Sequence, residues 1–186
     1  MTTLVFICGL VLGVLLASGY WQPRYKREKN KSLTDRLTGL NNGYYFEDNA
    51  QRLLHEKNVA ALIDIDNFKR FNSLFGYEVA DELLKLFVRR VKKALPPEAE
   101  FIRYKFGDEF LIVLPGSTTT NLKEIIDFVN VDLRNDPLLL SGVETDLQFS
   151  GGVTELQATD SPQSMAKRLS LALQQAKKTK DVTVIL

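Results

Sequence analysis

Residues 101–114 read FIRYKFGDEFLIVL, and this stretch indicates the fold class more directly than any other part of the chain. Two short runs rich in apolar residues, 101–105 and 110–114, flank the segment Phe106-Gly107-Asp108-Glu109. Strand-forming runs on both sides of a turn that contains glycine and aspartate predict a β-hairpin. The sequence on either side of this hairpin then decides the class.

Helical and strand-like patterns alternate around the hairpin. Apolar spacing predicts helices over 44–56, 68–75, 79–95, 121–133 and 163–178, and strands over 59–66, 145–156 and 182–186. The strand over 145–156 is expected to be broken at Gly151-Gly152. Interleaved helices and strands predict an α/β domain with a mixed β-sheet and surrounding helices.

Length and composition limit the range of functions. The chain has 186 residues, enough for one domain and a short appendage, and its 45% hydrophobic and 25% charged residues are typical of a globular protein. A formal net charge of +1 argues against nucleic-acid binding. The single cysteine, Cys8, excludes a disulfide framework and a thiolate metal site.

The N-terminal segment has the pattern of a membrane anchor. Residues 4–21 contain no charged side chain and are just long enough to span a bilayer as a helix. A basic run follows at once, which predicts that the rest of the chain remains in the cytoplasm. A cleaved signal peptide is the other interpretation, but it requires basic residues before the apolar run, and Met1-Thr2-Thr3 has none.

We therefore expect a transmembrane anchor over 1–21 and a short basic connector helix over 22–34. Gly9 and Gly13 form a G-x-x-x-G spacing, which allows two helices to approach closely and form a homodimer in the membrane. Glycine is also simply frequent in membrane helices, so the spacing has a second explanation. The expected location is a bacterial inner membrane, crossed once.

Four acidic residues are the candidates for chemistry. Asp64 and Asp66 end a buried strand, and Asp108 and Glu109 lie in the hairpin turn. Each pair alone has an ordinary explanation, as helix caps or turn residues. Together, a strand end and an adjacent hairpin can bring Asp64 and Asp108 close enough to share hard cations such as Mg²⁺. Asp66 is expected to turn away and cap the next helix, which leaves Asp64 as the metal ligand.

Ordered sequence blocks strengthen this interpretation. The blocks are Asp35-Arg-Leu-Thr-Gly-Leu40 with Asn42, then Asp64-Ile-Asp-Asn-Phe-Lys69, Asn72, Gly76, Asp81, Phe106-Gly-Asp-Glu-Phe110, Ser150-Gly-Gly and Ala172-Leu-Gln-Gln-Ala-Lys177. In this order they resemble the signature of the GGDEF domain over nearly all of residues 33–186. The resemblance implies a nucleotidyl-cyclase, palm-like domain over 35–186. It also implies that a homodimer condenses two GTP into cyclic di-GMP, each domain holding one GTP.

The resemblance also implies roles for individual residues. Asp64, Asp108 and the Ile65 carbonyl would bind two Mg²⁺ ions, with Mn²⁺ as a substitute, and Glu109 would be a further metal or acid–base residue. Asn72 and Asp81 would recognise guanine, since a carboxylate can accept hydrogen bonds from guanine that adenine does not offer. The remaining site residues would contact the nucleotide: Lys69, Lys177, Phe106 and Gly107.

The chain departs from the family pattern at several positions. Phe106 replaces the first glycine of the signature, and Gly107 is expected to take the positive φ of the turn. Tyr104 stands where an arginine is expected, Gly43-Tyr44 replaces an arginine pair, and Lys180-Asp181-Val182 replaces Gly-Arg-Asn. Other departures are Tyr77 for histidine, Ala80 for glycine, and Pro97-Glu-Ala-Glu100 at the expected Arg-x-x-Asp inhibition site.

Three functions therefore remain open. The first is a membrane-anchored diguanylate cyclase, favoured because the metal acids and both guanine-recognising residues are present. The second is a degenerate module that binds GTP or a partner protein without turnover, favoured by Phe106 and the missing arginine. The third is a cyclase that makes a different cyclic nucleotide. Asp81 limits this alternative, because it favours guanine in at least one half of the product.

Overall fold

A six-stranded mixed sheet forms the centre of the domain. The computed structural model describes residues 32–105 and 107–186, and residues 33–186 form one compact unit. The sheet order is β1-β3-β4-β2-β7-β8, with parallel pairs at both edges and antiparallel pairs between them. The strands are β1 (Asn41–Asn42), β2 (Asn58–Ile65), β3 (Glu100–Arg103), β4 (Glu109–Pro115), β7 (Phe149–Glu155) and β8 (Thr183–Ile185).

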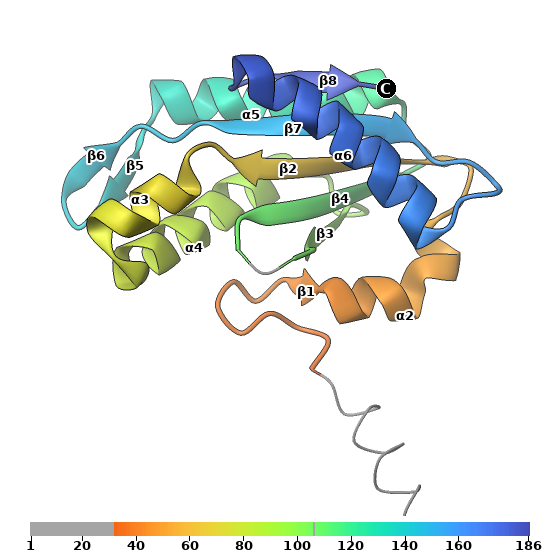
Figure 1. Cartoon of the computed structure of the whole chain (residues 1–186), viewed down its shortest axis with the longest axis horizontal. Coiled ribbons are helices and arrows are strands. Elements are labelled where there is room, and N and C mark those ends of the chain that lie inside the picture. The colour runs from red at the N-terminus through yellow and green to blue at the C-terminus, as the bar shows by residue number, and fades with distance from the viewer. Residues whose placement is uncertain (1–31, 106) are drawn as a thin grey trace, which may run out of the picture. The chain divides into compact units, whose positions relative to one another are not determined.

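Helices cover both faces of this sheet, and the hairpin of β5 (Leu138–Leu140) and β6 (Val143–Thr145) forms a separate small sheet (Figure 1). The helices are α2 (Gly43–Leu53), α3 (Phe68–Phe75), α4 (Tyr77–Ala94), α5 (Thr119–Asn135) and α6 (Pro162–Thr179). Figure 1 shows α6 crossing in front of the sheet, with α4 and α5 behind it.

The alternation of side chains along β2 separates two cores. Val59, Ala61 and Ile63 pack in the cluster that contains the buried residues of α4 and α5, whereas Ala60 and Leu62 pack in the cluster that contains those of α2 and α6. Successive side chains of a strand point to opposite faces, so Asp64 belongs to the α6 face. This alternation places the acidic end of β2 beneath the last turns of α6.

The predicted fold class is confirmed for the part that the structure describes, namely an α/β domain with a mixed sheet and surrounding helices. The predicted break at Gly151-Gly152 is wrong, because both glycines lie inside β7; the interruption is instead at residues 146–148, between β6 of the small sheet and β7 of the large one. The hairpin β5–β6 and the two-residue strand β1 were not expected from the sequence.

The expected membrane anchor over residues 1–21 lies outside the described residues. Of the expected connector over 22–34, only residues 32–34 are described; they are not helical, and Thr34 forms an isolated bridge with Asn41. Among the described residues, no helix combines the length and apolar character needed to cross a bilayer.

Candidate nucleotide and metal site

Two carboxylates meet at one end of the sheet. Asp64 is the next-to-last residue of β2, and Asp108 immediately precedes β4. The β2–β4 register sets Asp64 opposite Glu109, the neighbour of Asp108. Burial, followed by the nearby Asp64 charge, raises the pKa of Asp108 to about 6. The fold thus brings together the two acids that the sequence indicated as metal ligands.

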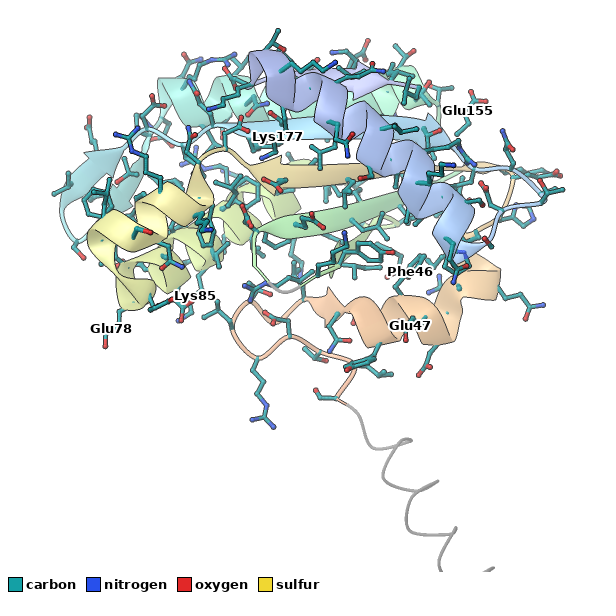
Figure 2. All side chains as sticks on the ribbon, in the orientation of Figure 1. Phe46, Glu47, Glu78, Lys85, Glu155 and Lys177 are labelled. Carbon is teal, nitrogen blue, oxygen red and sulfur yellow. The ribbon has the colours of Figure 1, made fainter. Side chains whose placement is uncertain are left out.

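Lys177 projects from α6 onto this acidic end of β2 (Figure 2). Its ammonium forms an ion pair with Asp64 and lies 3.2 Å from Asp66 Oδ1. The carbonyl oxygens of Asp64 and Ile65 each lie 3.5 Å from Lys177 Nζ. Burial opposes the charged ammonium, but the two carboxylates outweigh it and the pKa of Lys177 is raised. Burial also raises the pKa of Asp64, although Lys177 acts in the opposite direction.

Asp66 has a structural role that differs from the expected one. It does not cap α3, because the residue at that N-cap is Asn67, whose side chain makes no capping hydrogen bond. The Asp66 carboxylate instead accepts hydrogen bonds from Ser150 Oγ at 3.0 and 2.9 Å and from the Asp181 N–H at 3.1 Å. These bonds fasten the end of β2 to β7 and to the segment that follows α6.

Arg103 connects the signature hairpin to the loop before β1. Its guanidinium donates to the Gly107 carbonyl from Nε at 3.0 Å and from Nη2 at 2.7 Å, and it lies 3.0 Å from Asp35 Oδ1. Thr38 donates to the same Asp35 carboxylate through its N–H and its hydroxyl. Although burial acts the other way, these donors hold the pKa of Asp35 below its ordinary value. Arg103 therefore fixes the loop that carries Asp108.

Gly107 has a φ of +118°, which confirms the expectation that it takes the positive φ of the turn. Phe106 lies outside the described residues. Gly43 supports the same hairpin from the other side, because a Cβ on Gly43 would lie 2.7 Å from the Tyr104 carbonyl oxygen. Real Cβ atoms do not approach an oxygen so closely, so the larger side chain expected from the family pattern does not fit at residue 43 without a shift of the hairpin.

The remaining expected site residues lie on α3 and α4. Lys69 is exposed on α3, and Asp81 is exposed on α4. Asn72, on α3, is half-buried, and its Oδ1 is a buried acceptor without a hydrogen-bond partner. Within residues 32–105 and 107–186, none of these three side chains bonds to Asp64 or Asp108. The structure therefore separates a cluster of acids and Lys177 from the helices expected to hold the base.

The comparisons with known proteins agree with this geometry. The family model described as "Diguanylate cyclase, GGDEF domain" matches residues 32–182. The chain belongs to the GGDEF family. It is 27% identical over 157 residues to the diguanylate cyclase DgcP of Pseudomonas aeruginosa, covering 81% of this chain and 23% of that protein. It is 29% identical over 155 residues to the response regulator PleD of Caulobacter vibrioides, covering 78% of this chain and 34% of that protein.

Solved structures confirm the fold of this GGDEF domain. The crystal structure of the diguanylate cyclase SiaD of Pseudomonas aeruginosa, in complex with its activator SiaC, superposes with a TM-score of 0.76 at 24% identity. The match covers 94% of this chain and 73% of that one. By contrast, the chain spans only about a quarter to a third of the two curated relatives named above.

The donor set of the GGDEF domain fits magnesium. Mg²⁺ prefers oxygen ligands and keeps waters and substrate phosphates in its coordination shell. The described residues contain no group of three or more acidic, histidine or cysteine side chains arranged as a metal cage, so the protein offers two carboxylates and backbone carbonyls. The ammonium of Lys177 already contacts the Asp64 carboxylate and the Ile65 carbonyl, as a stand-in cation would.

Sequence reasoning missed the residues that position this cluster. A Cβ on Gly152 would lie 2.5 Å from the Leu173 backbone nitrogen and 2.6 Å from the Ala172 Cβ. Helix α6 therefore packs directly on β7, and Lys177 follows Leu173 by four residues, about one helical turn. The Ser150-Gly-Gly block was recognised in the sequence as part of the family pattern, but nothing local showed that its purpose is to hold Asp66 and α6.

Proposed function

We propose that the GGDEF domain is a diguanylate cyclase that condenses two GTP into cyclic di-GMP with release of two pyrophosphates. The observation that carries the proposal is that the β2–β4 register brings Asp64 next to the Asp108-Glu109 pair, with Lys177 on Asp64 and close to the Ile65 carbonyl. The family membership and the relatives named diguanylate cyclase support the same reaction.

Each half-reaction forms one bond and breaks one. The ribose 3′-hydroxyl oxygen of one GTP attacks the α-phosphorus of the other, the α–β phosphoanhydride bond breaks, and pyrophosphate leaves with its electron pair. Asp64, Asp108 and the Ile65 carbonyl would hold two Mg²⁺ ions, which polarise the hydroxyl and neutralise the leaving group when bound. Glu109, opposite Asp64 in the sheet, would accept the hydroxyl proton.

Nucleotide selection is assigned to the neighbouring helices. The unpartnered Asn72 Oδ1 is an acceptor suited to an amino or N–H donor of guanine. Asp81 would accept from the same edge of the base, and Lys69 and Lys177 would contact the triphosphate. Closure of the second bond needs the 3′-hydroxyl of the other GTP, so the proposal requires two domains facing each other as a homodimer.

We also propose that residues 1–21 anchor the chain in a bacterial inner membrane with the GGDEF domain on the cytoplasmic side. The uncharged run over 4–21 and the basic residues after it support this arrangement. The G-x-x-x-G spacing would raise the local concentration of domains and favour the dimer.

One observation favours a second candidate, a GTP-binding regulator without turnover. Asp181 stands where the family pattern has an arginine, and its carboxylate forms an ion pair with Arg134 of α5 rather than offering a cation to phosphate. Incubation of the full chain with Mg²⁺ and GTP, ATP or both, read by mass spectrometry, separates the candidates. Cyclic di-GMP from GTP alone supports the cyclase. A mixed or adenine product indicates a different cyclase, and GTP binding without product indicates the regulator.

A further inference from the structure

The backbone of Lys180 is in a conformation that a side chain ordinarily avoids. Lys180 is the C-cap of α6, with φ +61° and ψ +164°. This region of φ/ψ space is occupied almost only by glycine, and other residues persist there when the surrounding structure forces them. Strain of this kind concentrates at ligand sites and active sites. The contacts of the Lys180 side chain are therefore the place to look for a function.

The Lys180 side chain extends toward the acidic end of β2. Its ammonium donates to Asn67 Oδ1 at 2.9 Å. Asn67 follows directly after Asp64-Ile65-Asp66 and is the N-cap of α3, and its side chain makes no hydrogen bond to the helix that it precedes. The exposed ammonium of Lys180 is therefore placed beside the segment that contains the metal-site oxygens.

The next residue, Asp181, makes different contacts from Lys180. The Asp181 N–H donates to the Asp66 carboxylate, and the Asp181 carboxylate forms an ion pair with Arg134. Asp181 therefore links the end of β2 to α5. Lys177 contacts the opposite end of the Asp64–Asn67 segment, at Asp64 and Ile65. Two ammonium groups from one helix end thus contact the four-residue segment Asp64–Asn67 at the end of β2, and only that of Lys177 is paired with carboxylates.

The geometry points to Lys180 as a residue that binds the triphosphate of the nucleotide. This inference rests on the proposed function, because it takes the Asp64–Asn67 segment as the place where metal-bound phosphate lies. An ammonium at hydrogen-bonding distance from this segment can move from the Asn67 amide oxygen to a phosphate oxygen, which is a stronger, charge-assisted acceptor. The strained backbone then has a function, since it directs the lysine toward phosphate.

The test compares two substitutions that treat the backbone differently. In the purified full chain, Lys180→Gly removes both the strain and the charge, whereas Lys180→Gln removes the charge and keeps the strain. We expect Lys180→Gly to raise the thermal midpoint without ligand by several degrees, and Lys180→Gln to leave it nearly unchanged. Both should weaken Mg²⁺–GTP binding, measured by calorimetry, by about 3- to 10-fold. Lys180→Arg should restore most of the affinity.

Matched controls keep the result specific. Lys178→Gln removes a charge from an exposed position two residues earlier and should leave GTP affinity within about twofold, because screening weakens distant exposed charges. Unchanged GTP affinity in both Lys180 variants would overturn the inference and leave the cyclase proposal standing. If the parent chain itself bound no GTP, both proposals would fail together. A rise in thermal midpoint with no loss of affinity would show that Lys180 has no role in binding.

Discussion

Lys177 Nζ is paired with the Asp64 carboxylate across 113 residues of sequence, and the same ammonium lies 3.5 Å from the Ile65 carbonyl. The Lys177 ammonium therefore contacts the same oxygens, of Asp64 and Ile65, that are proposed to bind Mg²⁺. In the absence of metal it offsets the repulsion among the neighbouring acids. When Mg²⁺–GTP binds, the ammonium is expected to leave these oxygens and turn to the phosphates.

Substitution of Lys177 tests this exchange through stability. We expect Lys177→Met to lower the free energy of unfolding in metal-free buffer by about 1–2 kcal/mol, between the values typical of exposed and buried ion pairs. Added Mg²⁺ should then stabilise the variant more than the parent, because no ammonium competes for Asp64. Thermal denaturation with and without Mg²⁺ measures both effects, with Lys178→Met as the control. An equal Mg²⁺ response in variant and parent would contradict the exchange.

Arg103 gives a prediction about the hairpin. Removal of its guanidinium by Arg103→Met takes both hydrogen bonds from the Gly107 carbonyl and the ion pair from Asp35, which keeps only its Thr38 donors. This loss should cost about 1–3 kcal/mol of unfolding free energy. Cleavage within residues 104–109 by a protease should also become faster, because the loop loses its anchor. Arg36→Met, an exposed arginine of the same loop region, is the control. Identical cleavage rates for both variants would show that Arg103 does not restrain the loop.

Gly152 should tolerate no added carbon. We expect Gly152→Ala to destabilise the domain by about 1–3 kcal/mol, because its Cβ would overlap Leu173 and Ala172 of α6. Gly151→Ala is a close comparison on the same strand, with its nearest contact at 3.3 Å from a Thr183 methyl group. Chemical denaturation should separate the two variants clearly. Equal losses would show that α6 can move away from β7, against the packing described here.

The sequence predicted the elements that have strong local signals. The helix over 68–75 has the bounds of α3, and Gly107 and Asp108 lie between β3 and β4, as expected of the hairpin. A strand that ends in acids and an adjacent hairpin were enough to propose that Asp64 and Asp108 lie close together. These features depend on neighbours in the chain, which is why the sequence alone could indicate them.

Other features depend on residues far apart in the chain. The Gly151-Gly152 pair resembles a strand break, but here it makes room for α6, and only the folded contact with Leu173 shows this. The three-residue strands β5 and β6 are too short for periodicity to detect. Asp66 had the local pattern of a helix cap, and its true partner, Ser150, is 84 residues away. The positive φ of Lys180 has no signal in the lysine itself.

Phe106 is the departure whose effect is easiest to measure. A glycine at this position of the family pattern lets the backbone pass close to phosphate, and any side chain there works against that approach. We expect Phe106→Gly to raise kcat for cyclic di-GMP formation several-fold, with GTP affinity equal or higher. Steady-state kinetics with matched protein concentrations would measure it. An unchanged or lower kcat would mean that the hairpin is adapted to the ring.

The central claim is that Asp64 and Asp108 form the metal-binding centre of a diguanylate cyclase, and Asp108→Asn tests it most directly. The substitution keeps the volume of the side chain and removes a charged ligand, so the domain should remain folded and turnover should be lost. The decisive measurement is cyclic di-GMP formed from GTP and Mg²⁺ by parent and Asp108→Asn chains, quantified side by side by mass spectrometry. The account predicts product from the parent and at least a hundredfold less, on the order of the loss typical for a key catalytic group, from a folded variant. Equal product from both would contradict it.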